Sequence, residues 1–202
     1  MRIATPLVVL GFLAAACPKE AAAQRPHRSG FWIESGAGTG TIRIGCSTCA
    51  EPIVAYGESS YLRAGGALSS RVLLGIEVFA LLDRTFGLAD GDSSLTVENV
   101  SIAPVVLWYP WRGGVFLKGG VGLAHGEVIV PGPDDDRTVL ASNTGSGVTF
   151  GVGFDMPIFK WLAITANLGV YYTALGDVTV AETRVDDVIA SMYNANFAIT
   201  IR

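Results

Sequence analysis

The chain has 202 residues, of which 50% are apolar and 16% charged, and its formal net charge at pH 7 is −4. This composition excludes the basic patch of a nucleic-acid-binding protein. The length fits one domain. Beyond the N-terminal segment, no stretch approaches the roughly 18 consecutive apolar residues of a membrane-spanning helix, so the apolar side chains must be accommodated in another kind of structure.

The N-terminal segment has the features of an export signal. Its second residue is arginine, residues 3–16 are an apolar run, and small residues follow up to Ala23. The run is too short to cross a bilayer as a helix, and this order of features is typical of a secretory signal peptide. We therefore expect residues 1–23 to be a signal peptide and residues 24–202 one exported domain. The alternatives are a retained anchor and a lipoprotein signal that would make Cys17 the acylated first residue.

Apolar and polar side chains alternate with period two along the rest of the chain. Such alternation is typical of β-strands whose two faces meet different surroundings. In chain order it predicts strands over residues 31–44, 58–68, 72–82, 100–108, 115–124, 148–155, 162–172 and 192–202. Glycines make the alternation weakest in the first of these strands. Pro104 lacks an N–H for the β-ladder, and we expect a bulge there.

The connections between these strands alternate in length. Short turns are expected at 69–70, 110–114 and 157–161, whereas 89–94, 131–136 and the stretch before the last strand are longer polar loops. Transmembrane barrels have an even number of antiparallel strands, short periplasmic turns and longer outer loops. The pattern therefore predicts an all-β, eight-stranded, antiparallel, up-and-down transmembrane β-barrel. An interfacial aromatic girdle is expected at the short-turn ends, formed by Trp108, Tyr109, Trp111 and Trp161.

The export signal, the strands at 148–154 and 162–172, the alternation of loop lengths and the terminal strand together resemble the small eight-stranded outer-membrane barrels of the OmpA/OmpX type. The resemblance implies a monomer in the outer membrane of a double-membrane bacterium. Its partners would be outer-membrane lipid, lipopolysaccharide and the barrel-assembly machinery, which would recognise the last strand. In that family the last strand commonly ends in an aromatic residue, whereas this chain ends in Ile201-Arg202.

A lipocalin-like barrel, with its apolar side chains pointing inward, is the alternative fold. The face opposite the apolar one is rich in Gly, with Thr, Asn and few charges. The surface of a soluble protein would instead carry many Lys and Glu residues. This composition favours the membrane barrel.

Five charged residues fall on the expected inner face of the barrel. They are Glu34, Arg63, Glu77, Lys118 and Asp155. Eight strands leave an interior just wide enough for side chains to fill, and buried charges need partners. We therefore expect polar side chains to fill the lumen, and a structural or surface-interaction role without catalysis. The alternative is a narrow pore constricted by these charges.

Cys46 and Cys49 lie in the first loop of the expected exported domain, where oxidation favours a small disulfide. Free thiols are the alternative. A thioredoxin-like redox pair would need an adjoining helix, and a zinc site would need further ligands. We therefore expect neither a cofactor nor a metal.

His125, Asp92 and Ser93 form a candidate catalytic set. The resemblance suggests it, because lipid A acyltransferases and deacylases are small barrels with such residues at the outer rim. The three residues have no fixed spacing. The alternation of side chains along its strand, here called parity, directs His125 toward lipid. A single histidine at the rim is the simpler interpretation. Residues 134–136 are three aspartates that could bind a divalent cation bridging to lipopolysaccharide, or could form a solvated loop tip.

Overall fold

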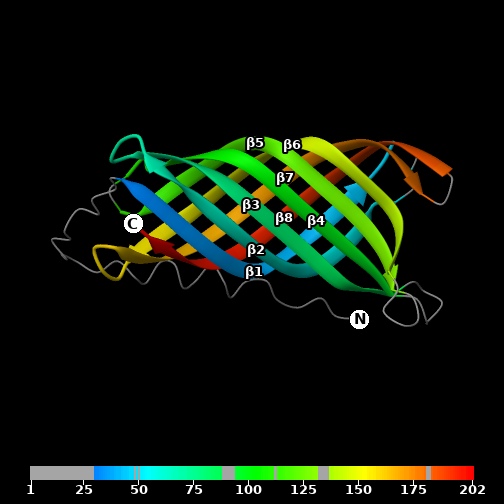
Figure 1. Cartoon of the computed structure of the whole chain (residues 1–202), viewed down its shortest axis with the longest axis horizontal. Helices are drawn as coiled ribbons and strands as arrows, with labels where there is room; N and C mark the ends of the chain where they lie inside the picture. The colour runs from blue at the N-terminus through cyan, green and yellow to red at the C-terminus, as the bar shows by residue number, and fades with distance from the viewer. Residues whose placement is uncertain are drawn as a thin grey trace, which may run out of the picture.

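The computed structural model describes residues 30–47, 49, 51–87, 94–111, 113–131, 137–180 and 183–202. Eight strands form one closed antiparallel barrel in which each strand pairs with its neighbours in sequence and β8 pairs with β1 (Figure 1). The strands are β1 (Phe31–Gly45), β2 (Ile53–Ala67), β3 (Val72–Gly87), β4 (Ser94–Trp108), β5 (Val115–Pro131), β6 (Arg137–Pro157), β7 (Leu162–Val180) and β8 (Thr183–Ile201). The predicted fold is confirmed. Among the described residues, no helix is long and apolar enough to cross a membrane.

The two ends of the barrel differ. The turn end carries the connections β2–β3, β4–β5 and β6–β7, the start of β1 and the end of β8 (Figure 1). The loop end carries the remaining connections. Strands extend further toward the loop end than predicted: β6 begins at Arg137 rather than Val148, and β8 at Thr183 rather than Met192. The β-ladder continues there, but the buried side chains include apolar ones such as Val97 and Ala141, so the pattern of an outward apolar face does not extend to these strand ends.

Pro104 does not produce the predicted bulge. β4 keeps its register with β3 through the pair Ile76↔Pro104, and its pairing with β5 passes from Ile102↔Leu123 to Val105↔Gly120 without a shift. The register shifts that do occur lie in β3–β4, β5–β6 and β7–β8, on the loop side of the barrel. The missing N–H is therefore accommodated without a change in register.

The outer surface of the barrel is apolar. Its exposed side chains include Leu62, Ile76, Ile102, Val121, Phe150, Leu168 and Phe197. Of the residues that the structure describes, five charged ones are buried inside, namely Glu34, Arg63, Glu77, Lys118 and Asp155. This arrangement suits contact with lipid. The strands do not adopt the lipocalin-like arrangement, in which the same apolar set would face inward.

Aromatic side chains form bands on this surface, but one residue of the predicted girdle, Tyr109, does not belong to them. Trp108, Trp111 and Trp161 are exposed at the turn end, but Tyr109 is only 1% exposed and lies inside the barrel. The reason is strand alternation, because Tyr109 follows the outward Trp108 and therefore points to the opposite face. Its predicted place in an interfacial girdle is wrong.

A second aromatic band, absent from the prediction, lies toward the loop end. It consists of Tyr56, Tyr172 and Tyr193, all exposed. Eight residues along β8 separate Tyr193 from Ile201, which lies beside Trp161 at the turn end. At about 3.4 Å per residue and a tilt of about 40°, the two bands are about 21 Å apart. This separation is close to the apolar band of about 25 Å found in outer-membrane barrels.

Candidate functional site

The lumen contains a charged network in its half nearer the turn end. β1, β2 and β3 place Glu34, Arg63 and Glu77 at successive register positions, Glu34↔Arg63 and Arg63↔Glu77. All three side chains are buried. Arg63 Nη2 lies 3.3 Å from Glu34 Oε1, and Arg63 Nε lies 2.9 Å from Glu77 Oε2. None of the guanidinium N–H groups is aligned as a hydrogen bond, so Arg63 is held by charge and by its position between the two carboxylates.

Glu77 has two further partners from the opposite wall. Lys118 on β5 donates to both Glu77 oxygens, at 2.7 and 3.0 Å, and the Tyr171 hydroxyl on β7 donates to Oε1 at 2.6 Å. Lys118 Nζ also donates to the Tyr171 hydroxyl oxygen at 2.9 Å. Together with Glu34 and Arg63, these residues balance two cations against two carboxylates, as buried charges require.

Aromatic side chains surround this network. Tyr61 donates to Glu34 Oε1, and Thr200 on β8 donates to Glu34 Oε2 at 2.9 Å. The Arg63 guanidinium lies 4.4 Å from the centroid of the Tyr61 ring and 5.8 Å from that of Phe116. Cations over aromatic faces gain further electrostatic attraction. The network is thus tied to β1, β2, β3, β5, β7 and β8, and it spans the barrel.

A second network fills the turn end around Asp155. The hydroxyls of Tyr109 and Thr165 donate to Asp155 at 2.7 and 2.8 Å, and the Arg202 guanidinium forms an ion pair with it. The Arg202 backbone N–H also donates to the Trp161 carbonyl at 3.0 Å. Arg202 therefore has a structural role here, since it brings a partly buried positive charge to the buried Asp155.

The loop half of the lumen is different, because it contains an apolar cavity of about 190 Å³. The side chains around it include Ile42, Val97, Ala141, Leu175, Val178, Val188 and Ala190. The prediction that polar side chains fill the lumen is therefore wrong for this half. The alternation is reversed in this half: Val97 and Ala141 are buried inside, whereas the neighbouring Glu98 and Ser142 are not buried. The apolar face that points outward in the turn half therefore does not continue here.

Two asparagine amides border the cavity. The Asn143 Nδ2 donates to the carbonyls of Leu175 and Asp177, both at 2.8 Å. Asn99 is 1% exposed, and neither its Nδ2 nor its Oδ1 has a hydrogen-bond partner in the described part of the chain. The Asn99 amide is a candidate binding group that alternation in the sequence does not reveal, because its lack of a partner depends on the strands around it.

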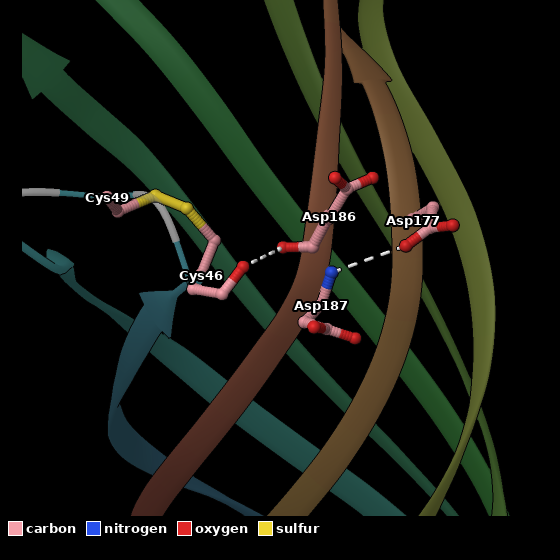
Figure 2. The surroundings of a disulfide bond; sticks show 6 residues. Cys46, Cys49, Asp177, Asp186 and Asp187 are labelled. Atoms are coloured by element: carbon pink, nitrogen blue, oxygen red, sulfur yellow. Dashed lines mark hydrogen bonds between the residues drawn. A yellow bond between two sulfur atoms is a disulfide. The ribbon is translucent and has the colours of Figure 1, made fainter.

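The Cys46–Cys49 disulfide forms at the rim of this cavity, with the two Cα atoms 5.1 Å apart. The turn is attached to the β7–β8 hairpin, because the Ser47 hydroxyl donates to the Asp186 carbonyl at 3.3 Å. Figure 2 shows the disulfide and Asp186. The Asp187 N–H in turn donates to Asp177 Oδ1 at 3.3 Å (Figure 2). The disulfide turn therefore links β1 to β8 across the seam where the barrel closes.

His125 lies on the outer surface of the barrel, with 45% of its side chain exposed. Its Nδ1 is 2.8 Å from Thr144 Oγ1, and its Nε2 is 2.9 Å from Glu127 Oε1 and 3.4 Å from Ser142 Oγ. The partners suggested for it in sequence, Asp92 and Ser93, lie outside the described residues, as do residues 134–136. The neighbours that the structure gives His125 are thus cross-strand residues of β6 and a residue of its own strand.

No protein-family model matches the chain, and no curated protein matches it in sequence. Solved structures do. Neisserial surface protein A is 16% identical with a TM-score of 0.57, and the match covers 86% of this chain and 97% of that one. Ail, the attachment invasion locus protein of Yersinia pestis, is 12% identical with a TM-score of 0.52, covering 85% and 99%.

A major outer membrane protein of Thermus thermophilus is 16% identical with a TM-score of 0.52, and the match covers 87% of this chain and 100% of that one. At these identities the likeness concerns the fold. The three neighbours differ in source and share the barrel. The chain therefore has the fold of the small eight-stranded outer-membrane β-barrels.

Proposed function

We propose that this chain is a monomeric outer-membrane barrel with a structural or surface-interaction role, and that its lumen does not conduct. The observation that carries the proposal is the ion-paired network around Arg63, which joins opposite walls of a barrel whose outer surface is apolar. Lipid and lipopolysaccharide would contact the outer surface. The barrel-assembly machinery would engage β8 during insertion.

The orientation follows from the usual arrangement of such barrels, with short turns in the periplasm and longer loops outside. The turn end, closed by Asp155 and Arg202, would then face the periplasm. The loop end, with its disulfide and the projecting β7–β8 hairpin (Figure 1), would be presented to the exterior. The loop end, whose turn is held by the disulfide, would be accessible to other molecules outside the cell.

Planar-bilayer recording tests whether the lumen is sealed. Purified barrel is expected to give no conductance steps, because Lys118, Glu77 and Arg63 contact one another across the interior. Conductance steps in the unmodified protein would refute the sealed lumen.

The non-catalytic part of the proposal concerns the cluster around His125. Acyl transfer needs free donors that stabilise an oxyanion. The N–H of Thr144, beside the imidazole, already donates to Asn143 Oδ1 at 2.8 Å, and β5 and β6 stay in register through this region. These neighbours favour a cross-strand polar cluster over a catalytic centre.

Mass spectrometry of lipid A tests this part. Cells that produce the unmodified protein and cells that produce His125→Ala should yield the same lipid A masses. Thr144→Val provides a second variant, because it removes the hydroxyl nearest the imidazole. A mass change that depends on His125 would show that the chain is a lipid-modifying enzyme.

A further inference from the structure

We propose that the cavity in the loop half of the barrel binds a small molecule with an apolar body and one hydrogen-bonding group, and that Asn99 recognises that group. This binding activity goes beyond the structural role proposed above. It rests on three features: the size of the cavity, the apolar character of its wall, and an amide that has no hydrogen-bond partner among the described residues.

The size fits one small molecule. The cavity has a volume of about 190 Å³. An engineered protein cavity of about 150 Å³ lined by Leu, Ile and Phe stays dry and binds benzene. A single six-membered ring with a short substituent, or an alkyl chain of comparable bulk, is therefore the class of ligand that fits.

The wall of the cavity is apolar, with Ile42, Val97, Val188 and Ala190 among its side chains. Glu98 and Glu127 also border the space, but they alternate along their strands with the inward Asn99 and with Gly126, so their side chains belong to the opposite face. Glu127 contacts the exposed His125. A water molecule would need two to four polar partners, and the wall offers few.

The Asn99 amide is the exception in this wall. Burying an amide without a hydrogen bond is unfavourable, yet both polar atoms of Asn99 lack partners in the described structure. Asn143, the other amide at the cavity, is already satisfied by backbone carbonyls. An amide that donates and accepts at an apolar wall is suited to a hydroxyl or carbonyl group on an otherwise apolar ligand.

Gly126 keeps the space beside this amide open. It pairs with Asn99 across β4 and β5. A Cβ atom at position 126 would lie 3.4 Å from Asn99 Nδ2 and 3.6 Å from Leu175 Cδ1. Any larger side chain would therefore extend into the region in front of the amide.

The polar networks close the lumen on the side of the turn end, so the cavity is a binding site rather than part of a channel. Its floor adjoins the stacked pair Phe79 and Tyr171, whose ring centroids are 4.1 Å apart and which belong to the same apolar cluster as the cavity wall. The Tyr171 hydroxyl then contacts Glu77. A ligand would enter from the loop end.

The test compares two probes of nearly equal shape, benzyl alcohol and ethylbenzene, with the full-length barrel in lipid nanodiscs. Chemical shifts of the Ala190 methyl, the Leu175 methyls and the Asn99 side-chain amide are followed by NMR. Both probes should give saturable shifts at these groups. Benzyl alcohol should bind roughly threefold to tenfold more tightly, as expected for one net hydrogen bond.

Three variants separate the parts of the proposal. Asn99→Leu should remove the preference for benzyl alcohol. Ala190→Leu, which places a larger side chain in the cavity, should weaken both probes at least tenfold. Ala195→Leu adds the same atoms to the exposed face of the same strand and should change neither affinity.

Several results would overturn the proposal. Shifts that rise linearly without saturation would mean partition into lipid alone, and an absence of shifts would mean that the cavity holds only water or collapses. Equal affinities in the unmodified protein and in Ala190→Leu would place the probes elsewhere. If Ala190→Leu does not fold, Gly126→Ala replaces it, because its Cβ makes ordinary contacts, and it should weaken benzyl alcohol more than ethylbenzene.

Discussion

Removing one charge from the lumen network should destabilise the barrel far more than removing a balanced pair. In Glu77→Gln the side chain keeps nearly its size, but Arg63 and Lys118 then face only the carboxylate of Glu34. In Lys118→Met the imbalance is reversed, because two carboxylates then face only Arg63. The double variant restores one cation and one carboxylate, Arg63 and Glu34, at 3.3 Å.

The magnitude follows from the burial of these groups. Glu77 and Arg63 are at most 1% exposed, and Glu77 accepts hydrogen bonds from Lys118 and Tyr171. Breaking a buried ion pair by removing one partner costs about 3–5 kcal/mol, because the other charge stays uncompensated. Each single variant should lose about that much. The double variant should lose no more than either one, which gives a coupling energy on the order of 3 kcal/mol.

Urea-induced unfolding from lipid vesicles, followed by tryptophan fluorescence, measures these free energies. The exposed loop residue Glu51 provides a matched control, since Glu51→Gln should change the free energy of unfolding by no more than about 0.5 kcal/mol. If the losses of the two single variants simply added in the double variant, the residues would not act as one network.

Three further predictions concern other parts of the barrel. Tyr109→Phe should lower the free energy of unfolding by about 1.5–3 kcal/mol, because it removes a hydrogen bond to a buried carboxylate; no loss in the same unfolding assay would contradict the interior position of Tyr109. Replacing Cys46 and Cys49 by serine should cost about 2 kcal/mol for so short a loop, a loss that reductant should reproduce in the unmodified protein. Leu168→Arg, near the middle of the apolar band, should cost about 2–4 kcal/mol, whereas Trp161→Arg at its edge should cost about 0–1 kcal/mol; equal costs would argue against the proposed membrane boundaries.

Parity along the strands was sufficient to place most of the lumen charges. Glu34, Arg63, Glu77, Lys118 and Asp155 are all buried inside the barrel, because in a strand every second side chain must share a face. Parity also directed His125 outward. The same alternation places Tyr109 inside, because it follows the outward Trp108; closeness in sequence to Trp108 and Trp111 does not indicate which face it occupies.

The partners of the charges required the closed barrel. Glu77 on β3 meets Lys118 on β5 and Tyr171 on β7, and these contacts depend on barrel diameter and strand stagger, which no single strand encodes. The same holds for Arg202 and Asp155, which β8 and β6 bring together at the turn end. Sequence spacing contains no signal for either contact.

The sequence by itself determined the number of strands, their order and which face of each meets the apolar surroundings. These properties are local: they depend on alternation along one strand and on the residues of the turns. Only the tertiary structure decided what occupies the lumen: ion pairs toward the turn end, and toward the loop end an apolar cavity beside Asn99, whose amide has no partner within the described ranges. The physical reason is that the contents of the lumen depend on how side chains from several strands meet across the barrel. A single strand determines only the direction in which each of its side chains points.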